Sequence, residues 1–298
     1  MKPANLRISS ELLFYYHGIG DSLLLSTVLY DLGQQKQERY LVGSPHPEIY
    51  RGNPFVIHLP FSQSVNYRVA RILELLGIVK KITHIDYYQE GYPPKKHIME
   101  LLSLRLGLEK IPRKPVVFLD ESEAKLRILP NSEKPWVAIQ STGNSSWTDN
   151  KNWGSHNFAK VVHLLSEHFS FVQIGIRGEP LLEGAYDLTG KLSLRKLFLL
   201  LRECKGFVGQ VGFAMHASAA MSLSSVIVYG GFEAPWQSGY AQNANIYNPI
   251  SCAPCWLEAQ CPYQKKCMTE ITPLMIAEEL VKIINRESIE PEGLSIRW

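Results

Sequence analysis

Two successive runs of alternating strand-like and helix-like segments constrain this chain more than any other feature of its sequence. The first run has strand-like segments at residues 12–16, 40–43, 56–59 and 82–85, and helical patterns at 22–32, 67–76 and 97–106. The second has strand-like segments at 137–140, 171–176, 206–209 and 225–229, and helical patterns at 157–168, 193–203 and 214–221. Such alternation predicts parallel sheets with crossover helices, in an α/β fold.

A stretch rich in proline and charge, residues 111–135, separates the two runs, and the apolar segment 116–119 interrupts it. The 298 residues are enough for two domains that each bury a core. We predict an N-terminal domain at 1–120, a linker at 121–135, a C-terminal domain at 136–273 and a terminal helix at 274–298. Thr272 is expected to cap that helix, with Pro273 in its first turn.

Composition and charge exclude several classes of protein. The net charge is only +3, from 31 basic and 28 acidic residues, so the electrostatic signature of a nucleic-acid-binding protein is missing. No apolar run approaches the roughly 20 residues that cross a bilayer. The first residues lack the apolar core of a secretory signal, and we therefore expect a cytoplasmic protein.

Gly18-Ile19-Gly20-Asp21 stands between the first strand and the first helix. Gly18 and Gly20 permit a tight turn and close approach of a ligand, although the third glycine of the dinucleotide-binding fingerprint is missing. The Asp21 carboxylate could take a proton from an acceptor hydroxyl. The alternative is that Asp21 caps the helix, which is a common role for aspartate at this place.

Three loops of the second half follow strands, where ligands of such sheets bind. The polar loop 147–153 contains Lys151, which could neutralise a diphosphate or simply be solvated. Gly212 precedes a helix of small residues that includes Met215 and His216, so free amides there could meet a phosphate. Tight packing of that helix is the alternative. Gly230 and Gly231 begin the third loop, whose aromatic residues suit a nucleotide or sugar, or seal the loop against the sheet.

Four of the five cysteines, Cys252, Cys255, Cys261 and Cys267, lie within sixteen residues. Four thiolates can bind one tetrahedral metal ion, and both zinc and iron suit them. Free or reversibly oxidised thiols are one alternative, and disulfides are another, which a reducing cytoplasm disfavours. Pro254, Trp256 and Pro262 stiffen the loop, so we expect a structural ion.

Together these segments resemble the heptosyltransferases of glycosyltransferase family nine. The resemblance rests on residues 18–24, Lys151-Asn152-Trp153, residues 187–191, the turn 209–216 and Cys267-Met268, in that order along the chain. It implies two Rossmann-like domains of the GT-B type facing across a cleft that holds the active site, and a terminal helix that packs back near the N-terminal domain. It also implies that Asp21 is the general base and that Lys151 contacts phosphate.

By this likeness the chain is an inverting transferase that moves a sugar from a nucleotide-diphospho-sugar, such as ADP-heptose, to a cell-surface glycan, a glycolipid or a protein. Catalytic magnesium is not expected, because the sequence has no Asp-x-Asp pair. Peripheral contact with the cytoplasmic face of the inner membrane fits such an acceptor. The alternatives are a sugar-nucleotide epimerase or hydrolase on a similar fold, and a non-catalytic sugar-nucleotide-binding subunit.

One departure from the family concerns Val211-Gly212-Phe213, where the family carries Asp, then Ser or Thr, then Gly. The acid and the hydroxyl are gone, so their contacts to the donor sugar cannot be transferred to this chain. Only the backbone amides of the helix start remain for the phosphate.

Overall fold

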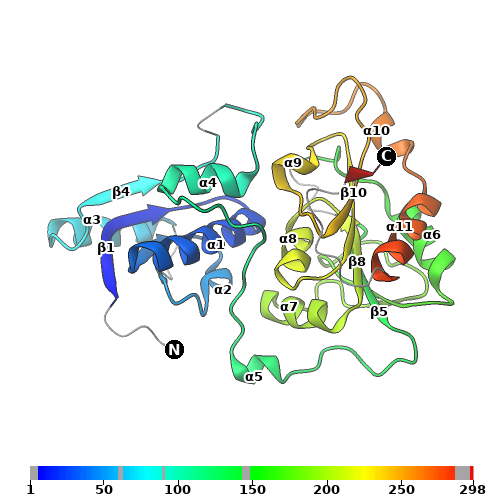
Figure 1. The fold of residues 1–298 in the computed structure, drawn as a ribbon, viewed down its shortest axis with the longest axis horizontal. Coiled ribbons are helices and arrows are strands. Elements are labelled where there is room, and N and C mark those ends of the chain that lie inside the picture. The colour runs from blue at the N-terminus through cyan, green and yellow to red at the C-terminus, as the bar shows by residue number, and fades with distance from the viewer. Residues whose placement is uncertain (1–5, 60–62, 89–90, 143–147, 286–295, 298) are drawn as a thin grey trace. The chain divides into compact units, whose positions relative to one another are not determined.

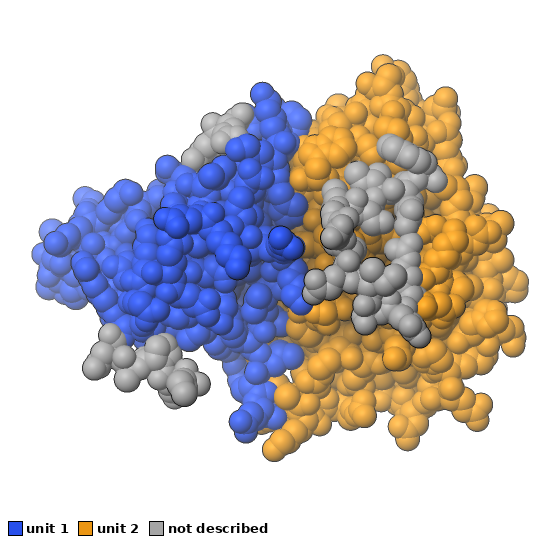
Figure 2. All heavy atoms as spheres, in the orientation of Figure 1, with its two compact units in different colours: residues 1–121 blue, residues 122–298 orange. Residues whose placement is uncertain are grey.

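The computed structural model describes residues 6–59, 63–88, 91–142, 148–285 and 296–297. The chain divides into two compact units, residues 1–121 and 122–298, coloured separately in Figure 2. Each unit is built on a parallel sheet with helices (Figure 1). The predicted α/β fold with two parallel-sheet domains is therefore confirmed.

Unit 1 has a four-stranded sheet in the order β3-β2-β1-β4, and all its strand pairs are parallel. Its strands are β1 (Arg7–Phe14), β2 (Glu38–Gly43), β3 (Val56–Leu59) and β4 (Lys81–His84). Its helices are α1 (Ile19–Lys36), α2 (Pro47–Tyr50), α3 (Gln63–Leu75) and α4 (Ile98–Leu106), while α5 (Glu121–Ala124) spans the boundary of the units. Leu12, Phe14 and Leu41 of the sheet form one core with Ala70 of α3.

Unit 2 has a seven-stranded sheet in the order β11-β10-β9-β8-β5-β6-β7. Its strands are β5 (Trp136–Ile139), β6 (Ser170–Gln173), β7 (Ala185–Asp187), β8 (Gly206–Gln210), β9 (Ser225–Gly230), β10 (Asn243–Tyr247) and β11 (Ile296–Arg297). Its helices are α6 (Ser155–Leu165), α7 (Leu194–Glu203), α8 (Phe213–Ala220), α9 (Pro235–Ser238), α10 (Lys266–Thr269) and α11 (Pro273–Asn285). Every residue of β8, β9 and β10 is buried, as expected of central parallel strands covered on both faces.

Helix α11 starts as its sequence predicts. The Met275 amide donates to the Thr272 hydroxyl at 3.3 Å, and Pro273 is the first helical residue. Ile276 and Leu280 are fully buried, and the helix packs on α6 and on the strands β8, β9 and β10. The helix is thus part of the core of unit 2, while the predicted approach of this helix to the N-terminal domain stays a prediction.

The predicted linker is held by a buried ion pair. Arg195 of α7 donates from Nε to Glu123 Oε1 at 2.8 Å, and a second, shorter hydrogen bond joins the same two side chains. Glu203 accepts hydrogen bonds from the amides of Ile128 and Leu129. The segment after residue 121 is therefore fixed to α7 by its backbone as well as by this pair.

Local features differ from the sequence prediction at two places. Strand β1 ends at Phe14, so Tyr15 and Tyr16 lie beyond it in the loop. Strand β10, whose sequence includes two asparagines, was not predicted. Among the described residues, none of the helices combines the length and apolar character needed to cross a membrane.

Candidate active site

The candidate site in unit 1 lies where the strand order reverses. The chain moves outward from β1 to β2 and β3, and then returns to the other side of β1 with β4. In such sheets the loops after the two central strands leave a crevice for ligands. The loop after β1, residues 15–18, leads directly into α1, which carries Asp21 at its third position.

Asp21 caps its own helix. Its Oδ2 accepts a hydrogen bond from the Gly18 amide at 3.1 Å, and the half-buried side chain stays at the open end of the sheet. A Cβ on residue 18 would lie 3.0 Å from this oxygen, which explains the glycine. This hydrogen bond shows that Asp21 caps the helix, as the capping interpretation predicted. It does not exclude proton transfer, because a carboxylate has a second oxygen.

Aromatic rings and histidines surround this position, and the sequence interpretation had not singled them out. The rings of Tyr15 and His17 are 4.6 Å apart, and the His17 ring also contacts Tyr87. Burial raises the pKa of Tyr15, and the charge of Asp21 raises it further. The Tyr15 hydroxyl has no hydrogen-bond partner in the described part of the chain.

The histidines nearby are held neutral. Burial lowers the pKa of His17, His46 and His58, only partly offset by hydrogen bonds to backbone carbonyls. For His58 the partner is the Ser44 carbonyl, 2.9 Å from Nε2. Neutral imidazoles bring no positive charge to the surroundings of the Asp21 carboxylate, and in this form they can themselves accept a proton.

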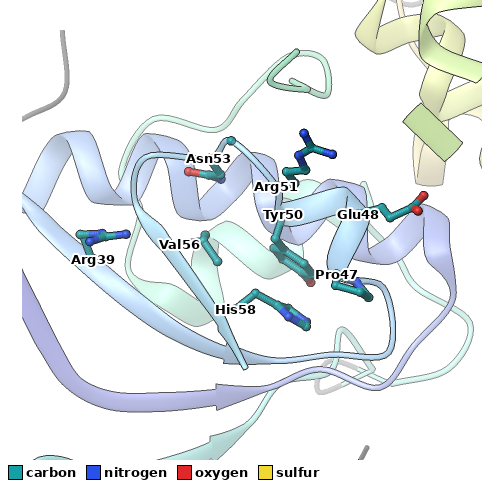
Figure 3. A pocket seen from close by; sticks show the side chains of 9 residues that line it. Arg39, Pro47, Glu48, Tyr50, Arg51, Asn53, Val56 and His58 are labelled. Atoms are coloured by element: carbon teal, nitrogen blue, oxygen red, sulfur yellow. The ribbon is translucent and has the colours of Figure 1, made fainter. Parts of the chain in front are cut away.

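A cavity of about 490 Å³ opens beside α2 and β3 in unit 1. Figure 3 shows the rings of Tyr50 and His58 next to one another, with Arg39 at the other end of the cavity. The two rings stack at 5.4 Å. None of the site residues predicted from the sequence lines this cavity.

In unit 2 the strand order reverses between β5 and β8. The loops after these strands carry Lys151 and Gly212. The end of the first loop is joined to the last residue of β8, since the Trp153 amide donates to Gln210 Oε1 at 3.3 Å. Two residues predicted from strand-end position thus share one edge of the sheet. Trp147, which begins the predicted loop, lies outside the described residues.

Lys151 is held by an acidic partner that the sequence interpretation did not identify. Its Nζ lies 3.0 Å from Glu233 Oε1 and 4.9 Å from the centre of the Phe232 ring. Glu233 is 5% exposed in its side chain and also accepts a hydrogen bond from Ser238. The lysine is therefore positioned rather than solvated, and its charge is balanced before any donor binds.

The start of α8 is open to a ligand at Gly212. Among the described residues, no atom lies within 4 Å of the position that a Cβ would take there. The residues on either side are used for packing, because Val211 is 4% exposed and the Phe213 ring contacts Phe198. Val211, which stands where the family has its acid, thus belongs to the core, while Gly212, which stands in place of the hydroxyl residue, leaves the backbone accessible.

Met215 and His216 lie behind this helix start. Met215 is fully buried, and its sulfur accepts a hydrogen bond from the Tyr229 hydroxyl at 3.1 Å. The Nδ1 atom of His216 is 2.6 Å from the Tyr240 hydroxyl, with the residue 6% exposed. These contacts fit the packing alternative, and direct donor contacts by the two residues stay predictions.

The two glycines at the end of β9, Gly230 and Gly231, make room for the cysteine loop. A Cβ on Gly230 would collide with Met268, and one on Gly231 would lie 2.9 Å from both Ala253 and Cys267. The Cys255 amide also donates to the Gly231 carbonyl at 3.0 Å. The structure therefore explains both glycines by packing, and their role in donor binding stays a prediction.

All four clustered cysteines are free thiols, as is Cys204. Burial raises the pKa of Cys267 to about 11, and the charges of the other three loop cysteines add to that rise. The thiols are therefore near enough to interact electrostatically. However, no group of three or more histidine, cysteine, aspartate or glutamate side chains in the described residues is arranged to hold a metal ion.

The segment 187–191 forms a self-contained turn at the end of β7. Asp187 accepts hydrogen bonds from the Thr189 amide and hydroxyl at 2.8 and 2.6 Å, and from Lys191 Nζ at 2.6 Å. Lys191 and Thr189 lower the pKa of Asp187 from 3.8 to about 2. The turn therefore depends on an ionised carboxylate.

This lowered pKa predicts how stability depends on pH. Because the folded pKa lies below the unfolded value, the contribution is present above about pH 4 and is lost as the pH falls toward 2. Asp187→Asn should cost about 1 kcal/mol at pH 7, since the ion pair is partly exposed. Urea unfolding from pH 6 to 2 should show the two proteins converging, and a constant difference would contradict this account.

A second carboxylate lies at the same edge of the sheet as Lys151. Glu179 follows β6, and its Oε1 accepts a hydrogen bond from the Ile176 amide at 2.9 Å. Burial raises its pKa, while the Thr142 hydroxyl and the Ile176 amide offset part of this rise. Gly175 leaves the space that the carboxylate occupies. Glu179 lies six residues beyond the last residue of β6, and the sequence interpretation did not single it out.

The two sheets with reversed strand order define a protein with two nucleotide-binding-type α/β units, and one of them offers a lysine and an open helix start at its switch point. Residues 76–267 match glycosyltransferase family 9 (heptosyltransferase). The chain belongs to this family.

The relatives agree with this assignment. Lipooligosaccharide heptosyltransferase 2 of Campylobacter jejuni is 25% identical over 158 residues, which cover 47% of this chain and 49% of that protein. The chain thus spans about half the length of the curated relative that it matches.

Solved structures share the fold. The iron-containing dodecameric glycosyltransferase TibC of enterotoxigenic E. coli is 18% identical with a TM-score of 0.70, covering 94% of this chain and 79% of that one. ADP-heptose lps heptosyltransferase II of E. coli is 16% identical with a TM-score of 0.64, covering 92% and 98%. At these identities the likeness shows the fold alone.

Proposed function

We propose that the chain transfers a sugar, of the heptose class, from a nucleotide-diphospho-sugar to a hydroxyl of a cell-surface glycan, glycolipid or protein. The proposal rests on the residues at the points where the strand order reverses in each sheet. Unit 1 has the carboxylate of Asp21 there, and unit 2 has Lys151 and the open helix start at Gly212. The names of the relatives, which include heptosyltransferases, support the choice of sugar.

In the proposed reaction the acceptor oxygen attacks the anomeric carbon of the donor from the face opposite the diphosphate. The new carbon–oxygen bond forms as the bond to the diphosphate oxygen breaks, so the configuration inverts. Asp21 takes the proton of the acceptor hydroxyl. The leaving diphosphate carries the electron pair away, and Lys151 and the amides at Gly212 stabilise its charge in place of magnesium.

Lys151 should contribute to donor affinity through its charge. We expect Lys151→Ala to weaken binding of ADP by roughly tenfold at low salt, the value of one charge-assisted hydrogen bond. The loss should shrink as salt is raised. Lys160→Ala, which removes an exposed lysine of α6, is the matched control.

Glu233→Gln sharpens this test. It keeps a polar side chain beside Lys151 but removes the competing negative charge, so ADP should bind at least as tightly as to the wild type. Calorimetric titration at two salt concentrations measures all four proteins. Equal ADP affinities of the wild type and Lys151→Ala at low salt would remove Lys151 from the donor site.

We further propose that Cys252, Cys255, Cys261 and Cys267 hold one structural zinc or iron ion. The donor set suits either metal, the other three thiols help to raise the pKa of Cys267, and one structural relative is described as iron-containing. The four sulfurs would have to draw together around the ion, which would lower the raised pKa values by favouring the thiolates. Four thiolates leave no open position for catalysis, so the ion would only fix the loop.

Reduced cysteines fit a cytoplasmic protein. We propose that the reaction takes place there, at the cytoplasmic face of the inner membrane when the acceptor is a glycolipid. At this location the donor is in solution and the acceptor is in the bilayer, so one surface of the protein has to contact the lipid.

A further inference from the structure

Helix α3 and the turn after it expose a large group of apolar side chains. Leu75 is 87% exposed, Leu76 67%, Ile72 55% and Ile78 52%. At helical spacing, Val65, Arg68, Ile72, Leu75 and Leu76 fall on one face of the helix. We call these five residues with Ile78 and Lys80 the α3 surface.

The opposite face of α3 already packs on the sheet of unit 1. Ala70 is fully buried in the core cluster, and Tyr67 and Leu73 pack against that cluster. The helix is therefore apolar on both its inner and outer faces. Packing of the helix on its own sheet accounts only for the inner face, so the outer face needs a separate explanation.

The segment that contains the α3 surface is also strongly basic. Residues 63–81 contain four basic residues (Arg68, Arg71, Lys80, Lys81) and one acidic residue (Glu74), an excess equal to the +3 of the whole chain. Arg71 pairs with Glu74, and Lys81 pairs with Glu11. In the described part of the chain no ion pair involves Arg68 or Lys80, and both are exposed.

We propose that the α3 surface docks unit 1 on an anionic lipid bilayer, with α3 lying along the interface. An apolar stripe beside basic side chains is the pattern of a helix that lies in the headgroup region. The leucines and isoleucines would enter the acyl boundary, while Arg68 and Lys80 extend to the lipid phosphates. This inference rests on the proposed function only for the idea that the acceptor is in the bilayer.

The basic side chains of the α3 surface favour an anionic lipid over a second copy of the chain as its binding partner. A two-fold dimer would place the same surface of each protomer against the other. The basic side chains of one copy would then face those of its partner, and burial would increase their repulsion. Anionic headgroups instead neutralise them, so the charges favour the bilayer.

The test is sedimentation with vesicles of phosphatidylglycerol and phosphatidylethanolamine, compared with vesicles of phosphatidylcholine alone. The wild type should bind the anionic vesicles, and Leu75→Gln/Leu76→Gln should lower the partition coefficient by roughly tenfold or more, because two exposed leucines no longer insert. Leu181→Gln/Leu274→Gln removes two leucines of unit 2 that are 64% and 56% exposed, and should change binding by less than about twofold.

A second variant tests the charge. Arg68→Gln should weaken binding at low salt, and the difference should shrink at high salt. Wild-type protein that does not bind anionic vesicles, or a double variant that binds as well as the wild type, would overturn the proposal. So would a double variant that only converts an oligomer to monomers in light scattering. Vesicle binding needs no donor, so a failure of ADP binding or transfer in the wild type would count against the proposed function alone.

Discussion

Asp21→Asn should lower the rate of sugar transfer by roughly 100-fold or more, which is the usual size of a general-base contribution. The amide oxygen of asparagine can still accept the hydrogen bond from the Gly18 amide, so the helix cap is kept. The asparagine amide cannot, however, take the proton of the acceptor hydroxyl. The variant therefore separates the two roles that the sequence left open for this residue.

Transfer rate, thermal midpoint and ADP affinity should be measured together for this variant. Asp31→Asn is the matched control, because Asp31 lies on the same helix and is half-buried. The control should keep transfer within a few-fold of the wild type, and both variants should bind ADP normally. A near-normal rate for Asp21→Asn would reduce Asp21 to a helix cap.

If the four clustered cysteines hold a metal ion, as proposed, Cys255→Ser should remove it and destabilise the protein by about 4 kcal/mol, the stabilisation given by a ligand present at 1,000 times its dissociation constant. The cause is coupling of metal binding to the folded loop, which the Cys255 amide and the Trp256 amide attach to the residues after β9. The loss of stability should be greatest in the segment 251–269, so hydrogen exchange should show the largest decrease in amide protection there.

Cys204→Ser is the control for this experiment, because Cys204 is buried at the end of α7 and donates to the Leu200 carbonyl. It should keep the full metal content whatever its own effect on stability. Elemental analysis of protein purified without affinity metals should find about one zinc or iron per chain. Wild-type protein that is metal-free, with four reactive thiols and full stability, would contradict the structural role.

The fold was predictable from the sequence where burial dictates composition. Strand β9 is apolar throughout because parallel central strands are covered on both faces, and its position was predicted. Strand β10 was not predicted because Asn243 and Asn245 are polar and yet buried, whereas a buried parallel strand is expected to be apolar throughout. The side-chain amide of Asn245 donates to the Tyr240 carbonyl. The four-residue helices α2 and α5 are too short to show a period.

The candidate site residues also divide into those that a local sequence pattern marks and those that only the fold brings together. Asp21 and Lys151 were predicted as site residues because they follow strands, and strand ends are where these sheets bind ligands. Glu233 was not identified as the partner of Lys151, because 82 residues separate the two and only the fold brings them together. Gly230 and Gly231 were assigned to the donor on position alone, whereas the structure accounts for them by the side chains of Met268 and Cys267.

The most direct test of the proposed function follows the sugar itself. Nucleotide-diphospho-sugars carrying tritium in the sugar, ADP-heptose among them, are incubated with the protein and with cell-envelope or protein acceptors, and both the labelled acceptor and the released nucleotide are measured. The proposal predicts one nucleoside diphosphate released for each sugar attached, with the wild type but not with Asp21→Asn. Conversion of the donor to an isomer or to free sugar, or no consumption of any donor, would contradict it.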